Sequence, residues 1–209
     1  MGILYLPDPI HSHGRLLDPP SRSSLWRFEE YRKYKPVVNT EDNQLYCGGY
    51  EVQHGQNGGK CGICGDPYNQ SKPRDNEDGG IYDLGIVTRT FRAGQIIPVD
   101  VELTASHWGY WELRLCPNTP VTQECLDSHL LTFAGTPYTR YWVSHHPDHH
   151  GPKYYSVSVK LPSNLRCKKC VLQWHYHTGT RWGNCGDGTE ALGCGPQETF
   201  RGCADIAIE

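Results

Sequence analysis

The sequence predicts an all-β domain, an antiparallel sandwich whose long loops are held by disulfides. Three observations predict it: short runs in which apolar and polar residues alternate, turn residues between those runs, and ten cysteines in 209 residues. Alternation with a period of two is typical of strands with one buried face. An even, high cysteine count is typical of proteins that fold in an oxidising compartment. We therefore expect a secreted domain of the immunoglobulin/fibronectin-III-like type.

The predicted strands occur mainly after residue 81. In IPVDVELTASH the residues expected to face inward are Val99, Val101, Leu103 and Ala105. The segments WELRLC, YYSVSVKLP and CVLQWHYH repeat this alternation, and CADIAI is expected to form the last strand. Turns rich in Gly, Pro and Asn separate the runs, as they do in antiparallel sandwiches.

The region before residue 81 contains few alternating runs and many glycines. It is expected to form long loops, with short helical turns around residues 24–31, held by Cys47, Cys61 and Cys64. Neither an internal repeat nor a linker interrupts the chain, so we expect a single domain over residues 13–209.

Two C-x-x-C pairs, CGIC at residues 61–64 and CKKC at residues 167–170, raise the alternatives of a zinc site or a redox centre. The pairs lie about a hundred residues apart, far beyond the spacing of a zinc ribbon. No strand–helix–strand pattern of a redox domain surrounds them, and six further cysteines accompany them. We therefore expect structural disulfides, with a connectivity that the sequence leaves open.

Charge and hydropathy exclude several other classes of function. The 20 basic and 23 acidic side chains are mixed along the chain and leave a net charge of −3, without the basic block of a nucleic-acid-binding protein. No stretch approaches the roughly 18 apolar residues that a transmembrane helix needs. We expect neither a nucleic-acid nor a membrane partner, and a monomer.

His107 is a candidate functional residue because it continues the inward series of the strand before it. That series reaches His107 in phase, and Gly109 then ends the strand. A semi-buried, hydrogen-bonded structural histidine is the alternative. Near the C-terminus, Glu198 and Phe200 are two residues apart, so they share a face of an extended chain. The segment HHPDHH is expected to be a solvated loop rather than a metal site.

The segment PDPIHSHGRLLDPP draws attention to His13, which follows the small residue Ser12. The preceding residues, MGILYLPDPIHS, lack the basic start of a signal peptide, and their apolar run stops at Pro7. A small residue before the bond still suits cleavage. We expect residues 1–12 to be a leader or residual pro-segment that is removed, which leaves His13 as the first residue of the mature protein.

The chain resembles the lytic polysaccharide monooxygenases, most closely auxiliary-activity family 15, in six ordered segments: HGRLLDPPSRSSLWR, YCGGY, CGICGD, LTASHWGYWELRLCP, CVLQWHYHTGTRWGNC and ETFRGCADIAI. The resemblance runs from His13 to the C-terminus. It implies one copper ion held in a histidine brace, by the α-amino nitrogen and ring of the N-terminal histidine and the ring of a second histidine. His13 and His107 match these two positions.

The resemblance also implies roles for four further residues. Phe200 matches the axial position, which is tyrosine in some members; it has no oxygen to offer and would shield the metal. Ala105 matches a small residue beside the open coordination position. Trp174 and Glu198 match residues that support the metal ligands.

This ligand set agrees with the chemistry of copper. Three nitrogen donors with open positions suit tetragonal Cu(II) better than tetrahedral zinc, and the donors bind as neutral bases, so acid should weaken binding. A peptide nitrogen is a poor ligand because its lone pair is delocalised. His13 is therefore expected to chelate through its main-chain nitrogen only after the bond to Ser12 is cut.

The resemblance implies oxidative cleavage of chitin or cellulose, with an external reductant and H2O2 or O2 as co-substrate. Hydrogen abstraction is expected at C1 in preference to C4 of the sugar. A hydrolase would instead need two carboxylates flanking the scissile bond, and the sequence nominates no such pair.

An insoluble polysaccharide calls for a flat, exposed site with aromatic side chains that stack on sugar rings. Trp26, Trp108 and Tyr110 are the candidates, with packing in the core or sheet as the alternative for each. Two other functions compete: a secreted, non-catalytic carbohydrate (chitin)-binding protein and a disulfide-rich matrix protein. Neither gives His13 and His107 a role.

Overall fold

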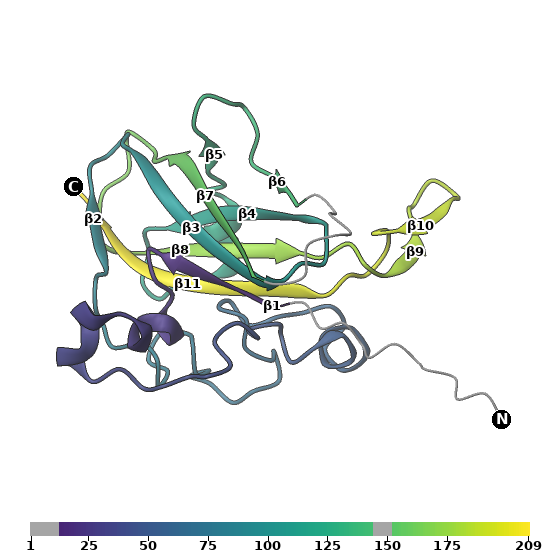
Figure 1. Cartoon of the computed structure of the whole chain (residues 1–209), viewed down its shortest axis with the longest axis horizontal. Coiled ribbons are helices and arrows are strands. Elements are labelled where there is room, and N and C mark those ends of the chain that lie inside the picture. The colour runs from purple at the N-terminus through teal and green to yellow at the C-terminus, as the bar shows by residue number, and fades with distance from the viewer. Residues whose placement is uncertain (1–12, 144–151) are drawn as a thin grey trace.

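Two β-sheets pack face to face in the computed structural model, which describes residues 13–143 and 152–209 (Figure 1). The first sheet has the order β1-β3-β7-β5 and contains β1 (His13–Asp18), β3 (Ile96–Ala105), β7 (Lys153–Lys160) and β5 (Thr132–Phe133). The second has the order β2-β11-β8-β4-β6 and contains β2 (Arg89–Phe91), β11 (Thr199–Ile208), β8 (Cys167–His177), β4 (Tyr110–Cys116) and β6 (Tyr141–Trp142). The predicted all-β sandwich is confirmed.

Neighbouring strands run antiparallel except for β11 and β2, which pair in parallel. A separate hairpin of β9 (Trp182–Asn184) and β10 (Glu190–Leu192) projects beyond one end of the sandwich (Figure 1). This hairpin was not predicted, because its strands are three residues each and too short for an alternating pattern.

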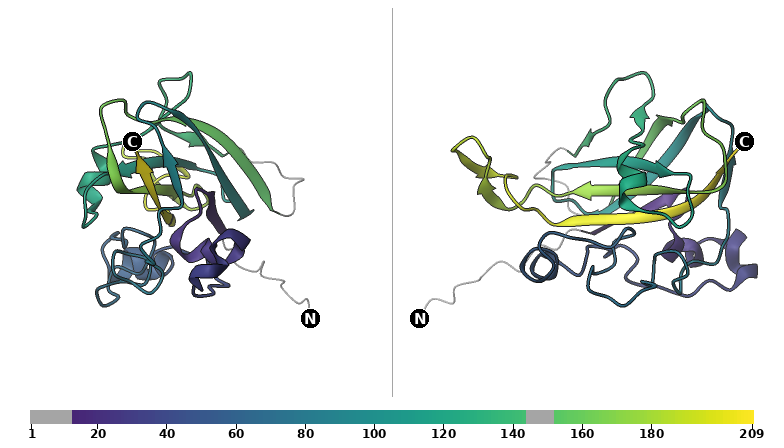
Figure 2. Two further views of the ribbon diagram at one scale, coloured as in Figure 1. Left: turned by 90° about the vertical axis from the view of Figure 1, so that its left-hand side faces the viewer. Right: turned by 180° about the vertical axis from the view of Figure 1, so that it is seen from behind.

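Helical structure is confined to four short elements in the described residues: η1 (Arg22–Arg27), η2 (Glu29–Tyr34), η3 (Glu51–Gln56) and α1 (Gln123–Asp127). The first two agree with the helical turns predicted around residues 24–31. The long segment from η1 to β2 lies along one side of the sandwich, beside β1 and β11 (Figure 2). Among the described residues, we find no helix long and apolar enough to cross a lipid bilayer.

The core lies between the sheets and is built by the residues predicted to face inward. Val99, Val101 and Leu103 of β3 are fully buried against the apolar residues of β4, β8 and β11. Strand β8 differs from a half-buried strand, because Gln173 and His175 on its outer face are also buried. The side-chain amide of Gln173 donates to the backbone oxygen of Ile63 in a long loop. Loops therefore cover part of the outer face.

Strand β1 lies in the region expected to be loops. Its sequence, HGRLLD, does not alternate between apolar and polar residues, because the polar Arg15 is buried as well as the apolar Leu16. Arg15 is paired with two carboxylates, Glu102 of β3 at 2.7 Å and Asp42 of the following loop. A buried arginine with partners on both sides breaks the alternation on which strand prediction depends.

Five disulfides use all ten cysteines: Cys47–Cys61, Cys64–Cys203, Cys116–Cys125, Cys167–Cys170 and Cys185–Cys194. The prediction of structural disulfides is confirmed, and no thiolate remains for zinc. The CGIC pair splits: Cys61 is joined to Cys47, and Cys64 to Cys203 of β11. The second of these bonds attaches the long loop region to the five-stranded sheet.

Candidate active site

One end of the sandwich brings together the termini of five strands. There β1 and β11 begin, β3 and β8 end, and β4 begins, because neighbouring strands run in opposite directions. Figure 1 shows the β9–β10 hairpin projecting beyond this same end. Most of the residues predicted for the site lie on these termini.

His13 and His107 lie at this end, His13 at the start of β1 and His107 in the β3–β4 connection just after β3. His13 pairs with Ala105 in the register of β1 and β3, and His107 follows Ala105 by two residues. Adjacent strands lie about 4.8 Å apart and two strand residues span about 7 Å. Imidazole side chains at such positions can reach one shared ion. His13 is half-buried and His107 is buried.

Tyr176 of β8 fixes the chain at His107. Its hydroxyl accepts the backbone N–H of His107 at 3.2 Å and donates to the backbone oxygen of Trp108 at 2.6 Å. The backbone oxygen of His107 accepts the N–H of Gly179 at 2.8 Å. The sequence predicted that Tyr176 faces the core, but nothing in it indicated that its hydroxyl reaches the β3–β4 connection.

The β3–β4 connection turns sharply after His107. Trp108 has a φ of 50° and Gly109 a φ of 80°, both in the left-handed region. A Cβ on Gly109 would lie 2.0 Å from the backbone oxygen of His177, so only glycine fits there. The sequence predicted that the strand continues through His107 to Gly109, but β3 ends at Ala105, and Trp108 and Gly109 form the turn into β4.

Gly14 allows β1 to approach the core beside His13. A Cβ at Gly14 would lie 2.6 Å from Cδ2 of Leu103 and 3.0 Å from Cη2 of Trp174. Trp174 is buried and stacks on Tyr176, with ring centroids 5.7 Å apart. Because Gly14 has no Cβ, the first residues of β1 can lie directly against the ring of Trp174.

Phe200 is fully buried at the start of β11. Its ring stacks on Tyr46 at 5.7 Å and is tilted against Tyr176 at 6.0 Å. Glu198, just before β11, is half-buried, and its backbone oxygen accepts the N–H and the hydroxyl of Thr178. Both residues lie at the same end of the sandwich as His107.

The three aromatic candidates are not all brought together. Trp108 and Tyr110 follow His107 directly, whereas Trp26 lies in η1, beyond the far end of β1 from His13. The indole N–H of Trp26 donates to the backbone oxygen of Asn39 at 3.0 Å. Tyr110 is packed at 5.1 Å against the ring of Trp142. The structure therefore separates Trp26 from the histidine pair.

Two exposed tryptophans were missed by the sequence reasoning. Trp142 of β6 is 67% exposed and Trp182 of the hairpin is 68% exposed. Both lie in strands of only two or three residues, which leave no periodic signal. Most of each ring is open to solvent, although Trp142 packs on Tyr110 and the indole N–H of Trp182 donates to Glu190 at 3.3 Å.

Two sequence features lie outside the described residues: the segment 1–12, expected to be a leader, and the histidine-rich HHPDHH at residues 145–150.

Comparison with known proteins gives two clear findings. A family model for "lytic polysaccharide mono-oxygenase, cellulose-degrading" matches residues 13–206. The solved lytic polysaccharide monooxygenase AA15 from Thermobia domestica, in the Cu(I) state, is 46% identical to this chain, with a TM-score of 0.86. The alignment covers 94% of this chain and 98% of that one.

A chitin-binding domain from Burkholderia pseudomallei is 16% identical, with a TM-score of 0.47, over 95% of this chain and all of that one. No match was found among curated proteins.

Proposed function

The chain belongs to the lytic polysaccharide monooxygenase family and is thus a copper-dependent polysaccharide monooxygenase, and we propose that His13 and His107 hold its copper. The observation that carries the proposal is the strand register, which sets His13 opposite Ala105, two residues before His107. The similarity to the Thermobia domestica enzyme, which covers 94% of this chain, supports the same proposal.

Three nitrogen donors make up the proposed brace: the α-amino nitrogen and ring of His13, and the ring of His107. The first donor requires that the bond between Ser12 and His13 be cut, because a peptide nitrogen is a poor ligand. The family match begins at residue 13, which supports a mature domain of residues 13–209. Three nitrogens with open positions suit Cu(II).

The bound copper, reduced by an external donor, would supply the activation of H2O2 or O2 that oxidative cleavage needs. The protein residues set its surroundings. Phe200 would shield the copper site without offering a ligand, since its ring is buried and carries no oxygen. Ala105 would leave room for a small co-substrate. Tyr176 would hold the backbone of His107 in place through its two hydrogen bonds.

Trp174 and Glu198 would support the ligands from either side. Trp174 packs beneath Gly14, next to His13, where it limits how far β1 can move inward. Glu198 lies at the start of β11, beside Phe200, and its backbone holds Thr178 after β8.

We propose that chitin or cellulose binds across the end of the sandwich. Trp108 and Tyr110 lie next to His107, and the exposed Trp142 and Trp182 would extend the stacking surface outward. An exposed aromatic face fits a flat crystalline polymer, whereas a soluble ligand would call for a pocket. Oxidation at C1 is expected in preference to C4.

We also propose that the protein is secreted and acts as a monomer. The five disulfides support an oxidising compartment. Such a compartment is where an enzyme that acts on insoluble polysaccharide would meet its substrate.

The test is mass spectrometry of the products released from chitin and from cellulose by the chain trimmed to His13, with copper and a reductant. We expect oxidised oligosaccharides from at least one polymer, as aldonic acids if C1 is attacked. The polymer that releases them identifies the substrate.

The control is His107→Ala, which should fold normally and release no oxidised product. A non-catalytic chitin-binding protein would bind the polymer equally well with either chain and release nothing. Unchanged product profiles from the His107→Ala variant would contradict the assignment of the brace.

A further inference from the structure

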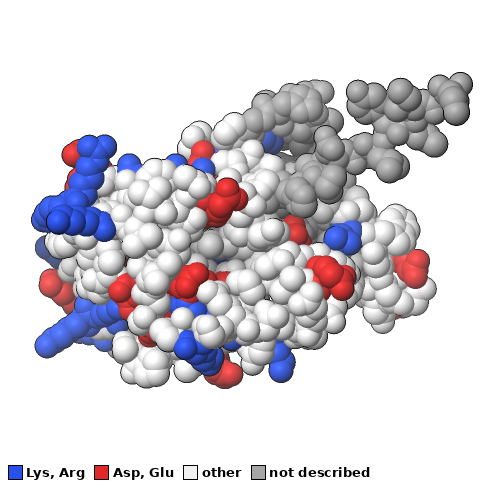
Figure 3. Space-filling view, turned by 90° about the horizontal axis from the view of Figure 1, so that it is seen from below, with Lys and Arg blue, Asp and Glu red and all other residues white. Residues whose placement is uncertain are grey.

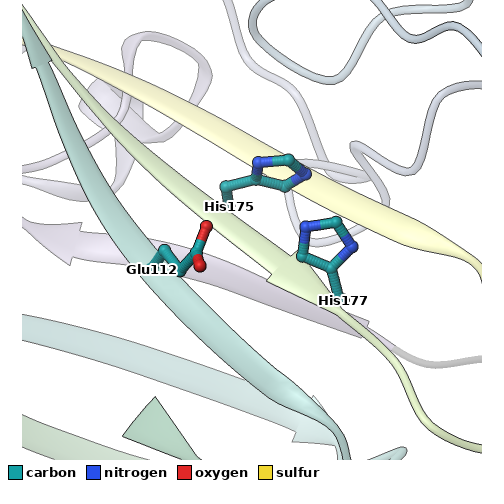
Figure 4. Close-up of side chains that lie close together, drawn as sticks. All are labelled: Glu112, His175 and His177. Carbon is teal, nitrogen blue, oxygen red and sulfur yellow. The ribbon is translucent and has the colours of Figure 1, made fainter. Parts of the chain in front are cut away.

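A second group of metal-binding side chains lies on the outer face of the five-stranded sheet. Glu112 projects from β4, and His175 and His177 project from β8 toward the same side (Figure 4). One potential ligand atom from each lies within 4.8 Å of the other two. Strand pairing fixes this arrangement, because Glu112 is directly opposite His175, and His177 is two residues further along the same face.

His175 is a buried imidazole that lacks the usual partners. It is 3% exposed, and neither of its ring nitrogens has a hydrogen-bond partner among the described residues. Buried polar groups are almost always paired, so such a side chain points to a missing ligand. Burial lowers the pKa of His175 well below its usual value. The ring is therefore neutral and offers a lone pair.

Glu112 supplies the negative charge of the group. Arg114 donates to its Oε2 at 2.5 Å and Arg140 donates to its Oε1 at 3.0 Å. Burial alone would raise the pKa of Glu112, but these two hydrogen bonds outweigh it and the pKa is lowered. Each carboxylate oxygen keeps a second lone pair for another partner. The arginines thus orient Glu112 and keep it ionised.

The same arginines decide which ions the group can hold. Arg114 and Arg201 add positive charge near His175 and His177, and Arg140 adds it near His177; this charge disfavours ions held by charge alone. Calcium and magnesium belong to that class, since they take oxygen ligands. An ion with real affinity for imidazole nitrogen has a second source of binding free energy. Zinc is the common ion of this kind that binds two histidines and a carboxylate.

We propose that Glu112, His175 and His177 form a second metal site, separate from His13 and His107, that binds a divalent ion of the zinc type. Ligands about 2.0–2.1 Å from a tetrahedral ion lie roughly 3.4 Å apart. Since their ligand atoms lie within 4.8 Å of one another, the three side chains would have to close in by at most about 1.4 Å. His177 is half-buried and its ring stacks on Tyr110, with ring centroids 5.0 Å apart, so this movement would slide it along the Tyr110 ring and leave a position for water.

The test is Zn(II) binding to the full chain in a His107→Ala background, measured by equilibrium dialysis, with Co(II) absorption as a report on coordination. We expect one zinc equivalent and a tetrahedral Co(II) spectrum. His175→Phe should weaken zinc binding at least tenfold and abolish that spectrum. Because both nitrogens of His175 are unpartnered, an apolar ring should be tolerated there. If that variant does not fold, His177→Gln at the edge of the group carries the same expectation.

The matched control is His129→Gln, an imidazole that bonds the backbone oxygen of Cys125, away from the group. It should leave zinc affinity unchanged. The histidines of HHPDHH are present in the parent chain and in every variant, so zinc bound by them does not affect the difference in zinc affinity between the chains. If His175→Phe and His177→Gln bind zinc as tightly as the parent chain does, the proposal is overturned.

Arg140 offers a test of opposite sign. Its side chain is about half exposed, and its guanidinium forms an ion pair with the Glu112 carboxylate at 3.0 Å. Arg140→Gln removes that charge and frees one carboxylate oxygen, so zinc affinity should rise several-fold. An affinity that stays the same or falls would contradict the site. Each of these readouts is independent of copper and of polysaccharide cleavage, so the two proposals can fail separately.

Discussion

Gly14 shows how a missing side chain positions a metal ligand. It follows His13, and its lack of a Cβ lets β1 lie against Leu103 and Trp174. Any larger residue would have to lift the start of β1 away from the core. That movement would carry His13 with it.

We predict that Gly14→Ala lowers the free energy of unfolding by about 1–3 kcal/mol, the usual range for overpacking a core. The matched control is Gly202→Ala in β11, where a Cβ would meet Leu16 and Ser21 at an ordinary 3.6 Å. Urea denaturation of both variants checks this. Equal stability of the two would contradict the packing argument.

Tyr176 is the second residue whose replacement is informative. In Tyr176→Phe, the N–H of His107 and the backbone oxygen of Trp108 lose their shared partner. We expect a loss of stability of about 1–3 kcal/mol. Copper affinity should also fall about tenfold, as is usual when a group that orients a ligand is removed. Calorimetric titration with copper measures the second effect, and a variant with reduced stability but unchanged copper affinity would show that Tyr176 does not position His107.

At the scale of single residues, the sequence predicted part of the site. The period of two carried the burial pattern of β3 through to His107, because burial on one face is what alternation records. The contribution of Tyr176 could not be predicted in this way. It depends on which backbone atoms its hydroxyl meets, and that is decided by the packing of β8 against the β3–β4 connection.

Among the strands and loops, too, some features could be predicted from the sequence and others could not. Long alternating strands such as β3 and β8 were predicted, whereas β1 and the β9–β10 hairpin were not. In β1, the buried Arg15 and its partners Asp42 and Glu102 replace the apolar residues that a pattern search looks for. The burial of the outer face of β8 depends on loops distant in sequence, such as the one that carries Ile63.

The β9–β10 hairpin is expected to contribute to substrate binding through Trp182. We predict that Trp182→Ala weakens binding to the insoluble polymer several-fold while copper affinity stays unchanged, because the ring is exposed and far from the core. The control is Tyr138→Ala, an equally exposed aromatic residue between β5 and β6. Pull-down with chitin and cellulose measures the effect. Equal binding by both variants would show that the hairpin does not contribute to polymer binding through Trp182.

The loop before β2 is attached to the sheet by Asp83. Burial alone would raise the pKa of Asp83, but the N–H groups of Gly79 and Gly85 and the ammonium of Lys169 lower it to about 2. A lowered carboxyl pKa stabilises the fold above the unfolded value of about 3.9. The contribution is lost as the pH falls through 2.

After allowance for solvent screening, we expect Asp83 to contribute about 1–2 kcal/mol near neutral pH. The difference in unfolding free energy between the wild type and Asp83→Asn should be constant above pH 5 and should shrink from pH 4 to pH 2. Urea denaturation across this range measures it. A difference that does not change with pH would contradict the assignment.

Across the described residues, the largest group of Lys and Arg side chains and the exposed Trp142 and Trp182 lie at different ends of the molecule. Lys and Arg side chains gather at the end that carries η1 and η2, where Arg32, Lys33 and Lys35 are exposed (Figure 3). The histidine pair and the β9–β10 hairpin lie at the other end (Figure 1). The surface proposed for polysaccharide binding therefore relies on stacking and hydrogen bonding rather than on charge.

This separation predicts that binding to a neutral polysaccharide depends little on salt. Screening weakens interactions between exposed charges and leaves apolar contact largely unaffected. Raising the salt from 50 mM to 500 mM should change the bound fraction less than about twofold, as measured by pull-down. A loss of most binding over this range would indicate that the basic end, and not the aromatic end, holds the polymer.

The measurement that tests the central claim most directly is copper affinity in three chains: one that begins at His13, one that keeps residues 1–12, and the trimmed chain with His107→Ala. We predict one tightly bound copper in the trimmed chain and binding at least about 100-fold weaker in the other two, since each lacks nitrogen donors of the brace. Equal affinity in all three would show that His13 and His107 do not hold the metal.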